Sequence, residues 1–570
     1  MKTNPTTAFL YLAICLARVG GLDGEEMRDS RRSSCGRNDD QCFTNWYKSV
    51  GVGGFVDEIV SPTNQQNPGF TIDESKLFLS GLTLLTELVD RVYGEGLRAR
   101  AHGSKWSLNN IAYTDDVVVN SQGLTYRKIG IEDETHVTPE YIDIRNRLAI
   151  VQSGVMTTDI NKDLSEKSLA LSTNAATDGQ RLVGAVSTGT HGSAVNYGSM
   201  PEFVRAIHIV IPGEHVLIQR ASDVVITESF AEWLGGARVI NDDTLFNAAV
   251  VSFGSFGIIH ALIIEAEPLY KLRLQSKQFN YDQVRPVLES LDPSSLGFEG
   301  IGSELPFHFE VAINAYRRNN GGCFVRLFEK IAVTDQAFST QAEGNVFSRE
   351  GANDTSIDLY EAMGTAFRPA MGLLPSAFLK RRVYGRVLQI VLRNFFKTNQ
   401  KRLQGASRKP HEWFTSRNNG SPSTTSPIAG TGLEFGVPAD RVVEVIEIIF
   451  DIVRDDPLAG QIAMRFIKKS SATLGFNKYD LTATVEMSGP YDVVFFRNQG
   501  RVRQKIKEAI AASGIPHTYH WGQDFPINDE WVRNAYGSSV DEWKQARLDF
   551  LGDAIDTFSN DLLEDLGLYP

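Results

Sequence analysis

The amino-acid sequence predicts an α+β protein of two domains, and three observations support this fold class. A chain of 570 residues is too long for one ordinary hydrophobic core, so two or more domains are expected. Short strand-like and helical segments mix up to about residue 268. From about residue 269 the chain changes to long strands with alternating apolar and polar residues, and a helical block follows.

Composition limits the kinds of partner that this chain can have. Its 42% hydrophobic and 22% charged residues are typical of a globular protein. A net charge of −12 leaves no excess of lysine and arginine to neutralise phosphates, so no nucleic-acid partner is expected. No run of about 18 apolar residues occurs, so the sequence predicts no membrane-spanning helix.

Residues 1–41 are expected to be a signal peptide followed by a disordered leader. Lys2 precedes a short apolar run at 8–17, which is the pattern of a secretory signal; a disordered tail with an apolar patch is the alternative. Residues 18–40 are polar and lack periodicity. The sequence therefore favours a secreted or extracytoplasmic protein, with the cytoplasm as the alternative.

The four cysteines are unevenly placed and suggest one disulfide. Removal of the signal would also remove Cys15. Cys35 and Cys42 are then close enough in sequence to pair, and Cys323 is left free.

In the first half of the chain, helices and strands alternate. Residues 77–97 have the apolar spacing of a helix, and Gly94 or Gly96 would end it. A second helix is predicted at 157–170, where Thr or Asp would cap the N-terminus. The predicted strands lie at 97–103, 115–121, 147–154, 203–213, 215–221 and 257–268.

In the second half, strands dominate. Residues 433–453 predict a strand followed by a helix that Pro438 and Asp440 open. Residues 375–397 predict a helix with one apolar stripe and one cationic face; packing within the domain is favoured, with a membrane-surface contact or a lid over a lipophilic substrate as alternatives. Further strands are predicted at 307–318, 323–330, 460–469 and 481–489, and a helix from about 499.

The common hydrolase, nucleotide and metal motifs are absent from the sequence. There is no Walker sequence, no G-x-S-x-G elbow and no Cys/His cluster with zinc spacing. The glycines at 51–55 are too few for a dinucleotide fingerprint and have no helix behind them. No metal site is expected.

Three loops carry the strongest functional signal. Residues 184–198, "GAVSTGTHGSAVNYG", consist almost entirely of small residues, which cannot fill a core but let backbone N–H groups approach a ligand closely. A loose surface loop is the alternative. Residues 98–107, "RARAHGSKWS", form a polar turn after a strand, and residues 252–264 contain two glycines that lead into a strand, where a β-bulge explains them equally well.

Together these loops resemble the vanillyl-alcohol oxidase superfamily of FAD enzymes, and within it the sugar-lactone and alditol oxidase branch. The family pattern R-A-R-G-S-G-H-S-W-S aligns without a gap to Arg98–Ser107, and G-A-x-S-T-G-T-H-G-S aligns to Gly184–Ser193. The pattern L-G-S-L-G-V-I is similar to Phe253–Ile259, and H-W-[GA]-K to His520–Gln523. The second loop is the most specific match.

The resemblance implies a two-domain PCMH-type FAD-binding fold. Residues 42–268 would form the FAD-binding domain, 269–510 a cap domain for substrate with a large antiparallel sheet, and 511–570 a segment that returns to the flavin. Backbone N–H groups of the first two loops would form anion-binding nests for the pyrophosphate, with Lys105 as a counter-charge, and the third loop would border the adenine. The residues expected to bind FAD are Ala101, His102, Gly103, Ser104, Lys105, Trp106, Ser107, Gly184, Ser187, Thr188, Thr190, His191, Gly192, Ser193, Gly257, Ile258 and His520.

Ser104 stands where many family members carry FAD covalently on a histidine. An ether to serine is not the expected linkage, so FAD is expected to bind non-covalently. A linkage through His102, two residues earlier, is the less favoured alternative because residues two apart can face the same way in extended backbone.

The substrate end departs further from the family. Its Glu-x-Arg pair becomes Ala463 and Arg465, and the lysine of H-W-[GA]-K becomes Gln523. Arg465 is expected to stabilise the reduced flavin, or else to lie on a solvent-facing strand. His520 is a candidate base or flavin contact, with a structural hydrogen bond as the alternative. Two carboxylates could replace the missing base, or be solvated or ion-paired instead: Glu486 and Glu310.

The expected reaction is hydride transfer from the CH–OH group of a small-molecule alcohol, polyol or lactone to flavin N5. Oxygen would reoxidise FAD to give hydrogen peroxide, or another acceptor would do so. An alternative substrate is a lipophilic alcohol, such as a sterol or a secondary metabolite, since the Glu of Glu-x-Arg is missing. A catalytically silent flavin- or sugar-binding protein is the alternative of another class.

Overall fold

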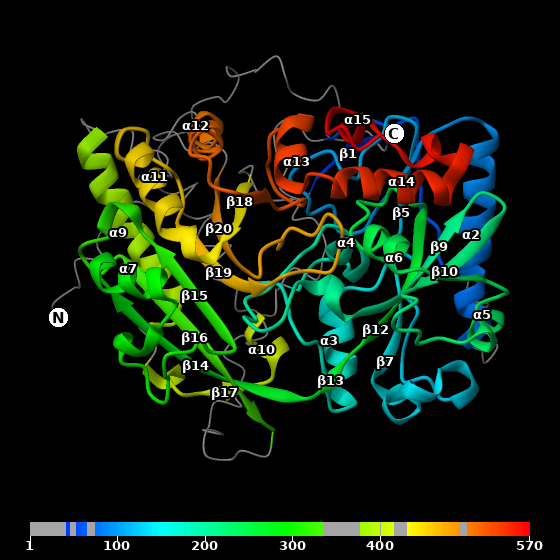
Figure 1. The fold of residues 1–570 in the computed structure, drawn as a ribbon, viewed down its shortest axis with the longest axis horizontal. Coiled ribbons are helices and arrows are strands. Elements are labelled where there is room, and N and C mark those ends of the chain that lie inside the picture. Colours follow the sequence, from blue (N-terminus) through cyan, green and yellow to red (C-terminus); the bar gives the residue numbers. More distant parts are fainter. Residues whose placement is uncertain are drawn as a thin grey trace, which may run out of the picture.

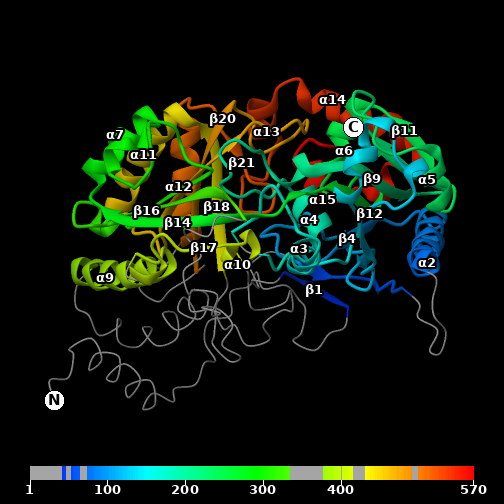
Figure 2. The same ribbon diagram turned by 90° about the horizontal axis from the view of Figure 1, so that it is seen from below.

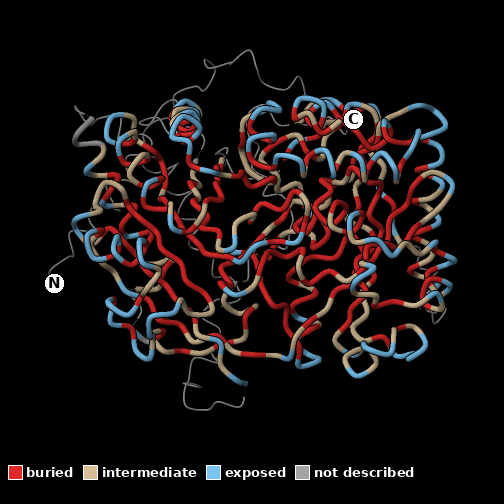
Figure 3. The backbone as a smooth tube through the Cα atoms, in the orientation of Figure 1, coloured by how far each residue is buried: buried red, intermediate tan, exposed pale blue. Residues whose placement is uncertain are grey.

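The computed structural model describes residues 41–45, 53–64, 74–176, 178–333, 377–398, 401–414, 430–490 and 499–569. Two parts lie side by side: one combines the first half of the chain with the last helices, and the other contains a large sheet (Figures 1 and 2). Buried backbone runs through the strands of both parts, while helices and loops on the outside are partly exposed (Figure 3). The fold is thus α+β, as expected.

The first part contains a six-stranded sheet of order β11-β10-β9-β12-β7-β6. Its pairs are antiparallel except β10 with β11, and helix α2 (Glu74–Gly94) packs against it and ends at the predicted glycine. The other helices of this part are α3 (Thr157–Glu166), α4 (Leu182–Ser187), α5 (Glu228–Trp233) and α6 (Asp243–Ala249). The strands are β6 (Arg127–Ile129), β7 (Leu148–Gln152), β9 (Val204–Ile211), β10 (Glu214–Gln219), β11 (Arg238–Asn241) and β12 (Ile258–Glu265).

A second, three-stranded sheet supports the first loop. Strand β5 (Val117–Asn120) lies between β3 (Glu58–Val60) and β4 (Ala99–His102), and both pairs are parallel. The segment after β4 therefore cannot be a hairpin turn, because parallel neighbours need a crossover connection. Two short strand pairs complete this part: β1 (Cys42–Thr44) with β2 (Gly53–Phe55), and β8 (Leu169–Ala170) with β13 (Glu267–Pro268).

The second part contains an antiparallel sheet of eight strands in the order β17-β14-β16-β15-β19-β20-β18-β21. Alternate residues face opposite sides of each strand. One face packs on helices α7 (Tyr281–Ser290), α11 (Val442–Asp455) and α12 (Gln499–Ala512). The strands are β14 (Tyr270–Phe279), β15 (His308–Ile313), β16 (Cys323–Ala332), β17 (Ser407–Arg408), β18 (Gly430–Pro438), β19 (Ile462–Lys468), β20 (Leu481–Pro490) and β21 (Thr518–Tyr519).

Helix α9 (Ala377–Phe395) covers part of the other face of this sheet. Its side chains Leu388 and Leu392 pack on Ala312 and Phe324 of the strands, while Arg382 and Arg386 are exposed. Packing within the domain is therefore confirmed for the apolar stripe of this helix. The short helix α10 (Pro410–Phe414) lies next to β14.

The C-terminal helices α13 (Asp529–Tyr536), α14 (Ser539–Leu551) and α15 (Asp561–Asp565) return to the first part (Figure 1). Trp543 Nε1 donates a hydrogen bond of 3.1 Å to the carbonyl oxygen of Ala248, and Arg547 Nε donates one of 2.8 Å to that of Ser255. The domain boundaries given above stay predictions, since β21 joins the large sheet from beyond residue 510.

Two further expectations concern cysteines and membranes. Cys323 is free and buried, as expected, and Cys42 is disulfide-bonded; Cys15 and Cys35 lie outside the described residues. Within the described stretches, none of the helices combines the length and the apolar character needed to cross a membrane.

Candidate active site

One cavity of about 480 Å³ lies between the loops of the first part and the large sheet. Fourteen of the seventeen residues expected to bind FAD line it, as do Arg465 and Glu486. The other three do not. Gly192 packs directly on the carbonyl oxygen of Asn174, the Ser193 hydroxyl donates to the carbonyl oxygen of Phe309, and Ile258 is buried in the core. The lining residues with a predicted FAD role are Ala101, His102, Gly103, Ser104, Lys105, Trp106, Ser107, Gly184, Ser187, Thr188, Thr190, His191, Gly257 and His520.

The first loop leaves the end of β4 as a tightly packed wall of the cavity. A Cβ at Gly103 would lie 2.4 Å from Cγ of Arg181, so only glycine fits there without a shift. Ser104 Oγ donates a hydrogen bond of 3.0 Å to the carbonyl oxygen of Gly179. Lys105 has a left-handed φ of 56°, its Nζ lies 4.7 Å from the centre of the Phe43 ring, and burial lowers its pKa.

His102 is held in a structural role. Its Nδ1 lies 3.0 Å from the carbonyl oxygen of Gly103, and its ring meets Phe43 edge-on at 5.5 Å. Burial, aided by the nearby Lys105, lowers its pKa to about 3, so the imidazole is neutral. Its Nε2 atom is shut off from the surface and has no hydrogen-bond partner in the described part of the chain. An atom so enclosed is poorly placed to attack a cofactor.

The second loop begins as a helix. Gly184–Ser187 form the end of α4, which corrects the expectation of a loop from residue 184 onward. The small residue at Gly184 leaves space for a ligand. This glycine lines the cavity, and a Cβ added to it would have no atom within 4 Å. Beyond the helix the chain turns at Gly189, where φ is 68°, and presents Thr190 and His191 to the cavity.

The third loop depends on Gly257. Its φ is +115°, and a Cβ there would lie 2.6 Å from Cγ2 of Ile209. The preceding Phe253 also has a positive φ of 58° and packs against Trp521 at 4.4 Å between ring centres. The loop therefore links the cavity wall to the C-terminal segment.

The large sheet supplies the substrate end of the cavity. Ala463 on β19 pairs with Glu486 on β20, which pairs with Glu434 on β18. Arg465 lies two residues beyond Ala463 and so faces the same side. Its Nη2 lies 3.3 Å from Oε1 of Glu434 and forms an ion pair with Glu486.

Gln523 completes a ring of polar side chains that hold one another, which consists of Glu434, Glu486, Arg465, Ser488 and Gln523. Its Nε2 donates to Oε2 of Glu434 at 3.2 Å and to Oε1 of Glu486 at 3.3 Å, and the Ser488 hydroxyl also donates to Glu486. A Cβ at Gly432 would lie 2.6 Å from Oε1 of Gln523, so glycine makes room for this amide. The lysine expected from the family is thus replaced by a neutral bridge between two carboxylates.

Charge pairing controls the protonation of this ring. Burial alone would raise the pKa of Glu434, but His191 and Arg465 outweigh it and hold that pKa well below its usual range. Burial alone would lower the pKa of Arg465, but Glu486 and Glu434 raise it. The Glu434 side chain is 2% exposed and that of Glu486 is 18% exposed, so Glu486 is the carboxylate that a substrate can reach.

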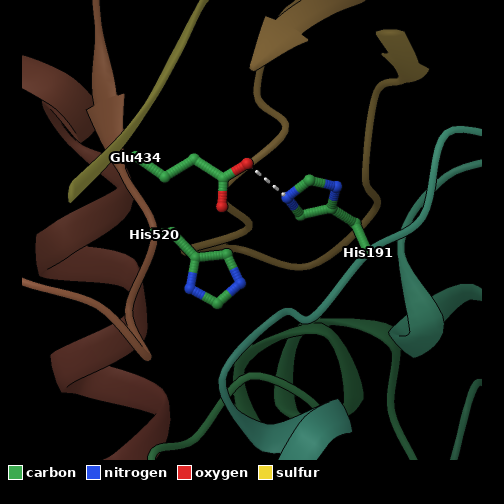
Figure 4. Close-up of side chains that lie close together, drawn as sticks. All are labelled: His191, Glu434 and His520. Carbon is green, nitrogen blue, oxygen red and sulfur yellow. Dashed lines mark ion pairs between the residues drawn. The ribbon is translucent and has the colours of Figure 1, made fainter. Parts of the chain in front are cut away.

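Two histidines complete the site (Figure 4). His191 Nε2 lies 3.2 Å from Oε1 of Glu434, and the ring centres of His191 and His520 are 5.6 Å apart. The backbone N–H of Gly522 donates to Nδ1 of His520 at 3.0 Å, and burial lowers the pKa of His520 to about 4. His520 is therefore neutral with its proton on Nε2, which makes it a hydrogen-bond donor rather than a base.

His191, Glu434 and His520 are also spaced like metal ligands, with their ligand atoms within 4.8 Å of one another. The guanidinium of Arg465 lies 3.3 Å from Glu434 and would repel a bound cation. The Nδ1 lone pair of His520 is used by Gly522, and its Nε2 carries the proton. These three side chains are better explained as a carboxylate held by His191 and Arg465, beside a neutral donor.

Glu310 is the candidate that the structure places away from the cavity. It accepts a hydrogen bond of 3.0 Å from Nε of Arg326, and Nε2 of His308 lies 3.5 Å away. Burial would raise its pKa, but Arg326 and His308 lower it well below the usual range. Glu434, by contrast, was not expected from the sequence, because one Glu in an alternating strand looks like an ordinary solvent-facing residue.

Comparison with known proteins agrees with this geometry. Residues 85–218 match the family described as FAD binding domain. L-gulono-1,4-lactone dehydrogenase of Mycobacterium tuberculosis is 26% identical over 36% of this chain and 40% of that protein. Alditol oxidase of a Streptomyces species is 27% identical over 33% and 38%. The chain thus aligns with less than half the length of these curated relatives.

Solved structures extend the likeness to nearly the whole fold. Cholesterol oxidase from Brevibacterium sterolicum has a TM-score of 0.60 and 12% identity, covering 92% of this chain and 96% of that one. A solvent-stable cholesterol oxidase has a TM-score of 0.62 and 13% identity, covering 92% and 97%. These structures share the arrangement of a mixed first part beside a large antiparallel sheet. The matched FAD-binding domain and the shared fold both fit the PCMH-type FAD-binding superfamily, with FAD as the cofactor.

The residues present fit FAD. The cavity wall contains Gly184, where the missing side chain leaves space for a close approach, and a buried Nε of Arg181 without a hydrogen-bond partner in the described chain. The first and second loops supply hydroxyl, amide and cationic groups of the kind that bind a diphosphate.

Proposed function

We propose that this chain is an FAD-dependent oxidoreductase that removes a hydride from the CH–OH group of a small-molecule alcohol, polyol or lactone. The observation that carries the proposal is one continuous cavity, with the FAD loops on one side and Glu486, Arg465 and His520 on the other. Bound FAD supplies the hydride acceptor, at its N5 atom. Oxygen or another acceptor then reoxidises it.

The side chains around the substrate end of the cavity have separate roles in this reaction. Glu486 takes the hydroxyl proton of the substrate, because it is the reachable carboxylate of the ring. Ser488, Gln523 and Arg465 hold its oxygens and so fix the direction from which it meets the substrate. His520 donates from Nε2 to an oxygen in the cavity. Arg465 balances the charge of the two carboxylates.

A polar substrate fits this end of the cavity better than a lipophilic one. Arg465, Glu434, Glu486, Gln523 and Ser488 all line it, and an apolar skeleton would displace water from these polar groups without offering them a hydrogen bond in return. The names of the relatives point to lactones and alditols. The cholesterol oxidases share the fold, and a sterol is the second candidate substrate that their names suggest.

A panel of polyols, sugar lactones and lipophilic alcohols tests the proposal. Each compound is added to the yellow protein, and hydrogen peroxide and reduction of a dye acceptor are measured in parallel. Bleaching of the flavin without oxygen by a polyol or lactone is expected, and the two readouts identify the acceptor. A yellow protein that no alcohol bleaches would support a silent flavin-binding protein, and a protein that rejects added FAD would refute the whole proposal.

We also propose that FAD is bound without a covalent bond. Ser104 donates its proton to a backbone carbonyl, and Nε2 of His102 is enclosed, so neither is poised to react. Precipitation of the protein in acid should leave the yellow colour in the supernatant. A yellow pellet would contradict this.

Secretion remains a proposal supported by Cys42. This residue is disulfide-bonded, and disulfides are typical of oxidising compartments. Expression in a secreting host should yield protein in the medium whose N-terminus, read by sequencing, lies beyond the apolar run at 8–17. Retention of the full N-terminus inside the cell would contradict it.

A further inference from the structure

One buried carboxylate joins three segments that are far apart in the sequence. Oε1 of Glu434 lies 3.2 Å from Nε2 of His191 and 3.3 Å from Nη2 of Arg465. Its Oε2 accepts a hydrogen bond of 3.2 Å from Nε2 of Gln523. Its backbone oxygen also accepts a hydrogen bond of 3.1 Å from the N–H of His520. Its side chain is 2% exposed, so water cannot replace a lost partner.

The three partners of Glu434 belong to different ends of the site. His191 is part of the second FAD loop, and its ring is fixed by Nδ1, which lies 2.9 Å from the carbonyl oxygen of Gly192, and by stacking on Phe476 at 5.2 Å. Arg465 and Gln523 also hold Glu486, the proposed base. Glu434 thus contacts the FAD loop through His191 and the ring around the base through Arg465 and Gln523.

We propose that Glu434 is a positioning residue that couples FAD binding to the order of the substrate end. FAD fixes the second loop and with it His191, His191 holds Glu434, and Glu434 fixes Arg465 and Gln523. Coupling between two sites is reciprocal, so a weakened contact between His191 and Glu434 must also lower the affinity for FAD. The inference rests on the proposed function for the identity of the base, but not for the affinity itself.

The first test measures FAD affinity without any substrate. Flavin fluorescence during titration gives the dissociation constant of the wild type, of Glu434→Gln and of Glu310→Gln. Glu434→Gln should bind FAD about tenfold more weakly or worse, within the range usual for coupled sites. Glu310→Gln is the matched control, because it too neutralises a buried carboxylate on the same sheet face but does not contact His191. Its FAD affinity should equal that of the wild type.

Thermal melting of the FAD-free proteins separates unfolding from lost affinity. If Glu434→Gln does not fold, Glu434→Asp serves instead, since it keeps the charge and withdraws it from His191 by one methylene. A double-mutant cycle with His191→Phe should be strongly non-additive if the two residues act as a pair. Equal losses of FAD affinity in Glu434→Gln and Glu310→Gln would overturn the proposal, and so would additive losses of FAD affinity in the double-mutant cycle.

Hydrogen exchange tests whether FAD binding orders the substrate end through Glu434. FAD should slow amide exchange at 432–436 and 519–523 in the wild type, and this protection should shrink in Glu434→Gln although FAD is present at saturation. Unchanged protection in the variant would refute the coupling. Because neither readout needs turnover, a failure of the proposed oxidation would leave both results interpretable.

Discussion

At the scale of single residues, Ala463 and Glu486 face each other across two neighbouring strands. The family pattern places the carboxylate at position 463, and this chain places one on the strand next to it. Side chains directly opposite in an antiparallel pair have Cβ atoms about 5 Å apart, so a carboxylate can reach the same region from either strand. We therefore propose that Glu486 on β20 supplies the base that is missing at position 463.

If the base is on β20, a carboxylate placed at position 463 should restore the activity that is lost with Glu486. Glu486→Ala should lower kcat by about 10²–10⁴-fold, the usual contribution of a general base, while FAD stays bound. Adding Ala463→Glu to that variant should restore part of kcat, because the new carboxylate starts from the opposite position. Steady-state rates on the best alcohol of the panel measure both effects. A double variant as slow as Glu486→Ala alone would show that Glu486 acts elsewhere.

His520 gives a prediction about pH. Its lowered pKa of about 4 keeps it neutral at all higher pH values, so its charge does not change between pH 5 and 8. The acid limb of the profile of kcat/KM against pH in that range must therefore belong to another group. In His520→Gln, which retains a donor, this limb should keep its midpoint while the plateau falls. A shift of the midpoint would mean that His520 titrates during catalysis.

At the scale of elements, the sequence pointed to the loops and to Arg465 and Glu486 but missed Glu434. Each FAD loop is a continuous stretch of sequence. The second loop could be recognised locally from its small residues, whereas residues 98–107 indicate a ligand site only when they are considered together with it. Glu434 stands in a strand whose neighbours Leu433 and Phe435 face the core, and nothing local distinguishes it from a solvated residue. The partner strand and its register, which decide what Glu434 meets, are tertiary facts. The tautomer of His520 likewise depends on the fold of Gly522.

Two glycines in these loops should respond differently to a methyl group. Gly257→Ala forces a residue with a Cβ into φ +115° and into Ile209, so it should cost about 1–3 kcal/mol of stability for the backbone strain alone. Gly184→Ala, whose methyl meets nothing within 4 Å, should leave the thermal midpoint unchanged but weaken FAD binding from within the cavity. Melting curves and FAD titrations distinguish the two. Equal stability of both variants would contradict the role given to Gly257.

At the scale of the whole molecule, a row of buried histidines crosses the six-stranded sheet. Gln152 Nε2 lies 2.7 Å from Nε2 of His260, His260 Nδ1 lies 3.1 Å from Nδ1 of His208, and His208 Nε2 lies 2.9 Å from Nδ1 of His215. The amide nitrogen of Gln152 can only donate, so each imidazole accepts with one nitrogen and donates with the other. The row is complete when all three rings are neutral, and one added proton breaks it.

Burial lowers the pKa of each ring in this row. Burial lowers the pKa of His260 to about 3. Burial and the neighbouring His260 lower the pKa of His208 well below its ordinary value. The pKa of His215, which is half-buried, is also lowered by burial. In the unfolded chain these groups have a pKa near 6.5. The unfolded state therefore binds more protons below about pH 6.5, so the folded state loses stability as the pH falls from there toward the lowered values.

The free energy of unfolding should thus decrease below about pH 6.5. The slope should be at most about 1.4 kcal/mol per pH unit for each proton that the fold excludes. Urea unfolding of the FAD-loaded protein at pH 7.5, 6.5, 5.5 and 4.5 measures it. His208→Asn removes the central ring and should make the slope shallower than that of the wild type. Equal slopes in the variant and the wild type would mean that the loss of stability in acid has its origin in other buried groups.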